Sequence, residues 1–290
     1  MTLKHVIHRL TENEALNFVL TNYIPRRTAT RFVGWLSRIE NPLVRDLSIG
    51  VWRLFSDLDL SEARTSSFRS LHDCFIRELK QGARPISRSP DTLVSPCDGI
   101  VGASGRIRDG VMLQVKGSPY ALSELVRDET LVDTYRNGTY VTLRLTSTMY
   151  HRFHAPHDAR IVEVRHIAGD TFNVNPPTLK RLQKVYCRNE RAVIDMRVAD
   201  GGRRVTLVPV AAILVAGLRL NFVEMPPDRS HTEPWIRACS VDVAKGQELG
   251  WFEHGSTIIV LGEAGFELCE AVAQDETIRM GMPLMRMPNA

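Results

Sequence analysis

The chain has 290 residues, of which 43% are hydrophobic and 24% charged, and its formal net charge is +4. These values are typical of a globular protein with enough apolar residues for a core, so neither a structural metal nor a disulfide framework is required. The mild positive charge suits an anionic lipid surface or nucleic acid and identifies neither. Five widely spaced cysteines without a C-x-x-C pair argue against a zinc ribbon and favour a reducing compartment.

No apolar run approaches the length of a membrane span, and the first residues lack the apolar core of a secretory signal. We therefore expect the chain to stay in the compartment where it is made and to touch a membrane at most from one side.

Residues 1–70 are predicted to be helical, with Pro25 and the step from Asn41 to Pro42 separating the segments. No acidic residue lies between Glu14 and Glu40, so this stretch is basic and aromatic, which suits a helix in a membrane interface. The alternative is a helical cap that packs its apolar residues on the rest of the chain, and both hold if different faces are used. The residues at helical spacing are Leu16, Val19 and Leu20, then Phe32, Trp35, Leu36 and Ile39, and the arginines are Arg26, Arg27, Arg31 and Arg38.

From about residue 90, short β-rich runs alternate with Gly, Pro and Asp, as at residues 111–115, 140–145 and 205–210. This spacing favours a curled antiparallel sheet or a sandwich over alternating strand and helix units. Residues 70–86 are the expected joint, since Arg84 precedes a proline and favours extended chain. We expect an α+β chain with a helical region at 1–70 and a β-rich, sandwich-like domain at 71–290.

Asp98 lies in a Pro-Cys-Asp-Gly turn at residues 96–99, directly after an apolar run. An aspartate in such a turn usually accepts hydrogen bonds from local backbone amides. It could instead orient a histidine.

Three histidines, His151, His154 and His157, lie within residues 150–157. A zinc site is a weak interpretation, because positions three apart on a strand point to opposite faces and Pro156 argues against a continuing helix. We expect no metal site. Acid–base work is favoured, with one histidine activating a nucleophile and another acting on the substrate.

Gly255 and Ser256 precede a β-branched apolar run that begins at Thr257. Serine supplies a hydroxyl nucleophile, and glycine leaves its own carbonyl open to attack, so the pair suits attack of the serine on its own backbone. The alternative is a turn that starts a strand. With Asp98 and one of the histidines, Ser256 would complete a Ser-His-Asp set drawn from three distant segments.

In these residues the chain resembles the bacterial phosphatidylserine decarboxylases, which are pyruvoyl-dependent and self-processing. The resemblance covers most of the chain after residue 68. Two positions depart from the family pattern, Cys97 in place of Ala and His254 in place of Leu or Gly, and neither is a reacting group. Seven motifs in the family's order carry the resemblance: residues 75–80 with Arg84 and Pro85, 96–99, 114–117, 150–156, 169–176, 188–191 and 245–257.

The resemblance implies autocatalytic cleavage. His154, oriented by Asp98, takes the proton of Ser256, whose oxygen attacks the carbonyl of Gly255 to form an ester. Elimination then releases Gly255 as a C-terminus, and the dehydroalanine left at position 256 hydrolyses to a pyruvoyl group and ammonia. The products are a β chain of residues 1–255 and an α chain that starts at the modified Ser256.

The resemblance also implies the reaction, in which the pyruvoyl group at Ser256 forms a Schiff base with phosphatidylserine and accepts the electrons released with CO2. His151 is implied to assist decarboxylation or reprotonation, and the product is phosphatidylethanolamine. The implied partners are an anionic membrane surface and a second copy of the chain, without nucleic acid. The implied location is the cytoplasmic face of the inner membrane, with residues 71–290 as the catalytic domain.

Three rival interpretations stay open. A biotinyl or lipoyl-type carrier would need a modifiable lysine in a hairpin, and the chain has no such Met-Lys hairpin. A serine hydrolase would use the same triad without cleaving itself. A pyruvoyl decarboxylase of a soluble amino acid would not need the basic aromatic helices.

Overall fold

The computed structural model describes residues 26–114, 117–199, 201–212, 217–224, 233–253 and 256–288, and for residues 26–31 and 55 it describes the backbone alone. The predicted helical run at Leu16, Val19 and Leu20 lies outside these residues, as do Gly255 and His254.

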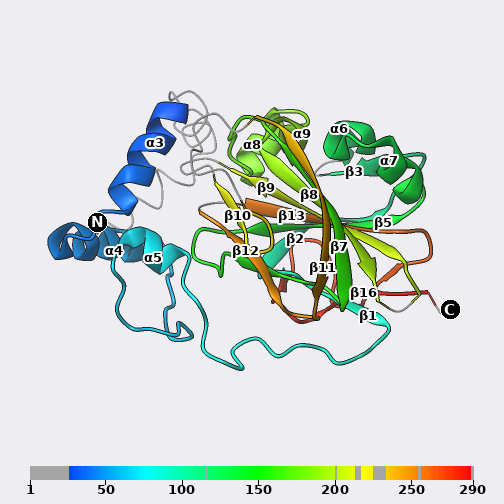
Figure 1. Ribbon diagram of the computed structural model, residues 1–290. Coiled ribbons are helices and arrows are strands. Elements are labelled where there is room, and N and C mark those ends of the chain that lie inside the picture. Colours follow the sequence, from blue (N-terminus) through cyan, green and yellow to red (C-terminus); the bar gives the residue numbers. More distant parts are fainter. Residues whose placement is uncertain are drawn as a thin grey trace.

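Eight of the described strands form one antiparallel sheet, which runs through the centre of the molecule (Figure 1). The predicted strands at 140–145 and 205–210 are confirmed as members of it. In spatial order the strands are β11 (Trp235–Val243), β7 (Ala159–Ile167), β8 (Arg191–Val198), β9 (Arg204–Ala211), β13 (Ser256–Gly262), β5 (Thr139–Leu145), β2 (Gly99–Arg106) and β15 (Thr277–Ile278).

Strand β13 lies in the interior of this sheet, between β9 and β5, and all seven of its residues are buried. Successive side chains of a strand point to opposite faces, so its apolar residues enter two separate cores. Ile258 and Val260 belong to one core, whereas Ile259 and Leu261 belong to the other. The strand that begins at Ser256 therefore fastens both layers of the molecule to the sheet.

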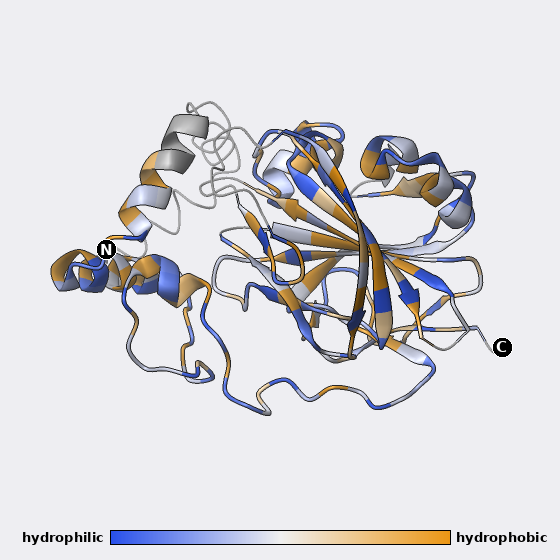
Figure 2. Cartoon of the chain, in the orientation of Figure 1, coloured by the Kyte–Doolittle hydropathy of each residue, from blue (hydrophilic) through white to orange (hydrophobic). Residues whose placement is uncertain are grey.

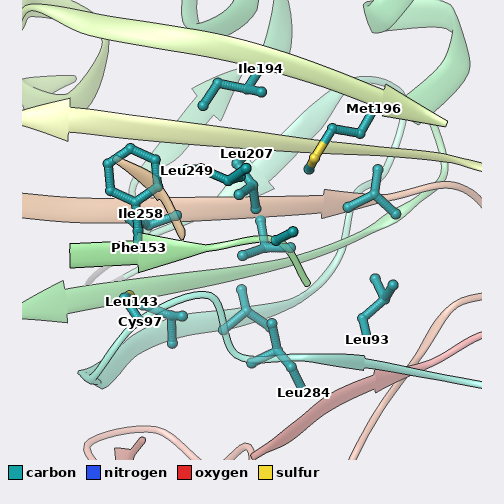
Figure 3. Packing of buried hydrophobic residues seen from close by; sticks show 14 of the residues in the cluster. Leu93, Cys97, Leu143, Phe153, Ile194, Met196, Leu207, Leu249, Ile258 and Leu284 are labelled. Carbon is teal, nitrogen blue, oxygen red and sulfur yellow. The ribbon is translucent and has the colours of Figure 1, made fainter. Parts of the chain in front are cut away.

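Two small sheets cover one face, and Figure 3 shows their side chains, among them Phe153, Leu249 and Leu284, packed against the main sheet. This layered arrangement confirms the predicted α+β class with antiparallel sheets. The first small sheet contains β10 (Leu218–Leu220), β12 (Glu248–Phe252) and β6 (Arg152–His154), and the second contains β1 (Thr92–Val94), β16 (Pro283–Arg286) and β14 (Glu267–Leu268).

Short helices and a hairpin cover the opposite face, where Leu125, Tyr135 and Tyr186 are fully buried (Figure 1). The predicted strand at 111–115 is the first arm of this hairpin and ends at Leu113. The elements are β3 (Val111–Leu113), β4 (Pro119–Ala121), α6 (Leu122–Val126), α7 (Glu129–Tyr135), α8 (Pro176–Arg181) and α9 (Val185–Arg188).

Within residues 26–75, which the structure describes, the helices are α3 (Arg26–Ser37), α4 (Pro42–Phe55) and α5 (Leu71–Phe75). Helix α4 starts at Pro42, so the Asn-Pro step separates α3 from α4 as predicted, and the side chain of Asn41 caps the helix by accepting a hydrogen bond from the amide of Leu43 at 3.0 Å. The division into a region at 1–70 and a domain at 71–290 stays a prediction.

The outer faces of α3 and α4 are apolar and exposed. On α4 the exposed residues recur every three or four positions, so they form one stripe, and Leu43 and Leu47 are 82% and 70% exposed. Phe32 and Trp35 on α3 are 57% and 62% exposed, which contradicts the alternative that these two side chains pack as a cap. Among the described residues no helix is long and apolar enough to cross a membrane. Figure 2 shows the apolar residues on both helices, and the stripe on α4, hereafter the α4 stripe, consists of Leu43, Leu47, Val51 and Leu54.

Candidate active site

Strand β6 is the element on which the candidate residues converge. The amide of His154 donates to the carbonyl of Pro96 at 2.8 Å, which places this histidine beside the turn that carries Asp98. On the other side, the amide of Phe252 donates to the carbonyl of His151 at 2.9 Å. Residue 252 belongs to β12, the strand that leads toward Ser256. A three-residue strand thus joins segments that lie far apart in the sequence.

His151 is fully buried and stays neutral. Its Nδ1 lies 2.9 Å from the carbonyl oxygen of Met149, and because a carbonyl only accepts, Nδ1 carries the hydrogen. Nε2 therefore presents a lone pair, and this buried atom has no hydrogen-bond partner among the described residues. Burial lowers the pKa of His151 to about 3. The ring of Phe75, at the end of α5, lies 4.0 Å from the imidazole and covers it.

His154 is buried and held at both ring nitrogens. Nδ1 donates to the carbonyl of Gly246 at 2.9 Å, so Nε2 is the unprotonated nitrogen and accepts from the Tyr150 hydroxyl at 3.0 Å. Burial lowers the pKa of His154 below its ordinary value, against the opposing influence of the Gly246 bond. A neutral imidazole with one unprotonated nitrogen is the form that a general base requires.

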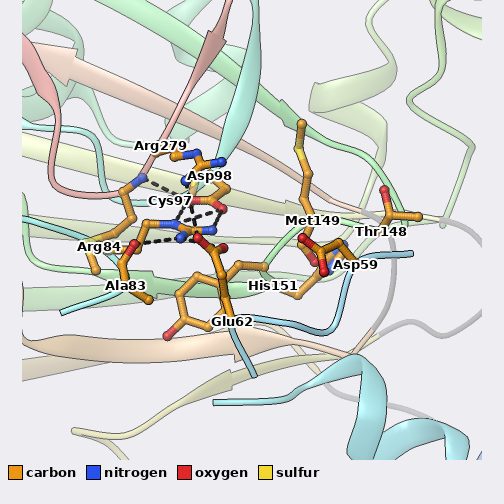
Figure 4. A network of polar contacts seen from close by, with 12 residues as sticks. Asp59, Glu62, Ala83, Arg84, Cys97, Asp98, Thr148, Met149, His151 and Arg279 are labelled. Carbon is orange, nitrogen blue, oxygen red and sulfur yellow. Dashed lines mark hydrogen bonds and ion pairs between the residues drawn. The ribbon is translucent and has the colours of Figure 1, made fainter. Parts of the chain in front are cut away.

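Asp98 is buried and forms an ion pair with Arg84. The guanidinium donates to the carboxylate from Nε at 2.8 Å and from Nη2 at 2.6 Å, and the amide of Met280 donates to it at 2.9 Å. Both side chains are only 7% exposed. Figure 4 shows this network, in which Arg84 also bonds Glu62 at 2.8 Å. The bond from Met280 thereby joins the turn at residues 96–99 to a segment near the C-terminus.

Ser256 is the first residue of β13 and is fully buried. It lies opposite Leu145 of β5 and Ala211 of β9, so its backbone is held on both sides. Its Oγ has no hydrogen-bond partner among the residues that the structure describes. A buried hydroxyl without a partner costs about 1–3 kcal/mol, so a reason for its presence is expected.

The segment before Ser256 is anchored by a buried carboxylate. Glu253 is 3% exposed at its side chain and forms an ion pair with Arg38, just after α3, at 2.7 Å. Arg219 lies 3.8 Å from the same carboxylate. These contacts connect the N-terminal helices to the chain two residues before the predicted cleavage position.

Backbone hydrogen bonds thus join the segments of Asp98, His151 and His154 to one another and to β12, the strand that leads toward Ser256. No described hydrogen bond joins the side chains of these four residues to one another. The bonds of Asp98 go to Arg84 and Met280, and those of the His154 ring go to Tyr150 and Gly246. The third histidine of the motif, His157, is bonded at Nε2 to the carbonyl of Pro90 at 2.8 Å. Among the described residues no group of three His, Cys, Asp or Glu side chains could hold a metal ion.

Comparison with known proteins identifies the family. The model of the phosphatidylserine decarboxylase family matches residues 71–286. The chain belongs to this family. The phosphatidylserine decarboxylase proenzyme of Haemophilus influenzae is 32% identical over 265 residues, which cover 89% of this chain and 91% of that protein. The proenzyme of Citrobacter koseri is 32% identical over 278 residues, which cover 90% of this chain and 84% of that protein.

Membership in the phosphatidylserine decarboxylase family indicates a decarboxylase, and the relatives are named as proenzymes. The matched range contains Asp98, His151, His154 and Ser256, whereas α3 and α4 precede it.

Several contacts of the site were not predicted from the sequence. Arg84 belongs to the family's first motif, and its position before a proline predicts extended chain and no ion pair. Tyr150 and Phe75 also lie within motifs, which was the available signal, but nothing in the motifs connects either ring to a particular histidine. The contact with Gly246 could not be predicted either, because it is made by the backbone carbonyl, a group that every residue carries.

Proposed function

We propose that the chain decarboxylates phosphatidylserine to phosphatidylethanolamine with a pyruvoyl group that it makes from Ser256 by autocatalytic cleavage after Gly255. Family membership supports the reaction, and the proenzyme relatives support the processing. The observation that carries the proposal is the Oγ of Ser256, buried at the start of an interior strand without a partner among the described residues.

The surroundings of Ser256 suit a pyruvoyl group. Strands β5 and β9 hold the backbone of β13 on both sides, so an α chain that begins at residue 256 would stay in place after the cut. The Oγ is not engaged in any described bond that cleavage would sacrifice. When formed, the pyruvoyl carbonyl would take up the substrate amine and accept the electron pair released with CO2.

For the cleavage step, we assign His154 as the base that accepts the Ser256 proton at Nε2, while the serine oxygen attacks the carbonyl of Gly255. The neutral form of His154, favoured by burial, supports this role. Asp98 contributes a negative charge that favours the imidazolium. In this structure Nδ1 of the ring donates the orienting hydrogen bond to the carbonyl of Gly246, so Asp98 acts on His154 through its charge.

For the decarboxylation step, we assign His151 as the group that moves a proton at Nε2. This atom is buried, unprotonated and free of described partners, so a substrate is the partner it lacks. The ring is already aligned by Met149 and by the face of Phe75. Exclusion of water around a neutral imidazole strengthens each polar contact that it makes.

We propose that the α4 stripe and the aromatic residues of α3 dock on the anionic cytoplasmic surface of the inner membrane. An exposed apolar stripe on a helix that also carries arginines suits an interfacial position. The opposite side of α4 reaches the site, because Trp52 stacks on Phe75 at 5.8 Å, and Phe75 in turn covers His151. A lipid substrate would thus meet the site through the element that contacts its membrane. The dimer stays a prediction, which light scattering of the purified protein would test.

The first experiment is the intact mass of the denatured protein. We expect two chains that break between Gly255 and Ser256, with a blocked α-chain N-terminus that borohydride reduces, and an unbroken chain for Ser256→Ala. A matched control, Ser104→Ala, removes a hydroxyl from another strand of the sheet and should leave the cut unchanged. An uncut wild-type chain labelled by a serine-directed phosphonate would instead indicate a hydrolase.

The second experiment supplies vesicles that contain phosphatidylserine and measures released CO2 together with phosphatidylethanolamine. Free serine in place of the lipid should give no CO2. A cleaved protein that acts on soluble serine and not on vesicles would contradict the proposed substrate while leaving the processing intact.

A further inference from the structure

Tyr150 is the side chain in direct contact with the nitrogen that the proposed cleavage uses. Its hydroxyl donates to Nε2 of His154 at 3.0 Å, and the two rings lie 5.7 Å apart. The phenol is buried, and the hydroxyl has no other described hydrogen bond that competes for it. Because Nδ1 of the same ring donates to Gly246, Nε2 is the accepting nitrogen, and its lone pair receives the hydrogen of the Tyr150 hydroxyl.

We infer that Tyr150 is a positioning residue for self-cleavage, whose hydroxyl holds Nε2 of His154 and sets how readily that nitrogen takes the serine proton. The inference rests on the proposed role of His154 as the base. One proton moves in the step, from Oγ of Ser256 to Nε2, and Tyr150 keeps its own. The bond from Tyr150 must therefore open before the proton arrives, since a single lone pair accepts one hydrogen at a time.

The charged groups around His154 act on its ring through their fields, whereas the described group that contacts Nε2 itself is the Tyr150 hydroxyl. Glu248 lies opposite His154 on β12, but its carboxylate is paired with Arg152 at 2.9 Å. Asp98, in the turn before β2, is paired with Arg84 at 2.6 Å. Each carboxylate that faces the ring is thus partly neutralised by an arginine, whereas the phenol touches the ring directly.

Tyr150 can hold this position because it does not ionise near neutral pH. Burial raises the pKa of the Tyr150 phenol well above its ordinary value. A donor to the lone pair stabilises the neutral imidazole and not the imidazolium, so its removal should make His154 more basic.

The test measures cleavage against pH for the wild type and for Tyr150→Phe. Precursor is pulse-labelled in a cell-free system, moved to buffers on both sides of neutrality, and followed by the appearance of the α chain. For Tyr150→Phe we expect the midpoint of the acid limb to rise by about 0.5–1 pH unit, the size of effect that one hydrogen bond has on a titration. An unchanged or lowered midpoint would overturn the inference.

A matched control separates this effect from loss of stability. Tyr135 is also a buried tyrosine with one described hydroxyl partner, Thr206 at 2.9 Å, but it lies in the core that contains Ile259 and Leu261 and makes no described bond to a histidine. Tyr135→Phe should leave the cleavage midpoint at the wild-type value. If it moves the midpoint as Tyr150→Phe does, the shift is a general effect of destabilisation and the inference fails.

A second measurement covers the case in which Tyr150→Phe does not fold. In the uncut Ser256→Ala precursor, nitrogen chemical shifts of His154 report which ring nitrogen carries the hydrogen. A hydrogen on Nδ1 and an accepting Nε2 are expected, and a hydrogen on Nε2 would overturn the inference. If the wild type is never cut, the proposed function itself fails, whereas a wild-type cut with equal midpoints refutes only the role of Tyr150.

Discussion

Replacing Arg84 by methionine separates the part that Asp98 plays in the fold from the part proposed for it in self-cleavage. The substitution keeps an unbranched apolar stem and removes the cation that donates to Asp98 from Nε and Nη2. The carboxylate would keep one described bond, from the amide of Met280 at 2.9 Å. A buried carboxylate that has lost its cation is the perturbation to be measured.

The size of the effect follows from burial. Both side chains of the pair are 7% exposed, so solvent compensates little of the loss. Breaking such a buried pair by removing one partner costs about 3–5 kcal/mol, and the remaining bond from Met280 places Arg84→Met near the lower value. For a chain of this length about 3 kcal/mol corresponds to a fall of roughly 5 °C in Tm. Combining Arg84→Met with Asp98→Asn removes the unpaired charge, so a coupling energy of about 2 kcal/mol is expected between the two substitutions.

Denaturant unfolding of the four proteins in the Ser256→Ala background measures the coupling without interference from cleavage. The control Arg160→Met breaks an exposed pair, 55% and 70% exposed at Arg160 and Asp242, and should leave the free energy of unfolding almost unchanged. With Ser256 restored, folded Arg84→Met should still cleave near the wild-type rate, whereas Asp98→Asn should cleave about tenfold more slowly because the charge that favours the imidazolium is gone. Equal slowing by both substitutions would show that Asp98 serves cleavage only through its ion pair with Arg84.

Three further predictions concern pH, catalysis and the membrane. Burial raises the pKa of Asp195 to about 6, so the native state binds this proton more tightly than the unfolded state. The free energy of unfolding should therefore fall by about 3 kcal/mol as pH rises from about 4 to about 6. In urea unfolding, Asp195→Asn should abolish this pH dependence, and an unchanged dependence would assign it to another group. His151→Ala should be cut normally yet release little CO2 from phosphatidylserine vesicles, and full decarboxylation would remove it from the reaction. Leu47→Glu should weaken sedimentation with anionic vesicles by about tenfold. The same substitution at another exposed leucine, Leu113→Glu, should leave binding unchanged. Equal binding by both variants would exclude α4 as the docking element.

The long elements of the fold were predictable because their patterns are local. The strands at 140–145 and 205–210 were expected from dense β-branched and apolar residues, and the start of α4 from the Asn-Pro step at 41 and 42. The helices α6 to α9 were not predicted, since each spans only four to seven residues and offers too few turns for a helical period. Their positions depend on the apolar face of the sheet that they cover.

The residues of the site were predictable as chemical types, and their partners were not. Motif and spacing singled out Asp98, His151, His154 and Ser256. The expectation that Asp98 orients His154 came from the family pattern, and its direct test is the Asp98→Asn cleavage rate. In the structure Nδ1 of the His154 ring donates to the carbonyl of Gly246, which lies 92 residues away in the sequence. Two mid-chain segments can be brought together in many ways that satisfy the same local pattern.

The sequence by itself determined which residues could do chemistry, which long strands would form, and which family the chain resembles, because composition, period and motif are properties of neighbouring residues. Tertiary structure alone decided that β13 lies inside the sheet with both faces buried, that an arginine pairs with Asp98, and that Phe75 covers His151. Burial and the identity of the partner set the charge state of each imidazole. Both depend on contacts between distant segments, so the reactivity of the site is a property of the fold.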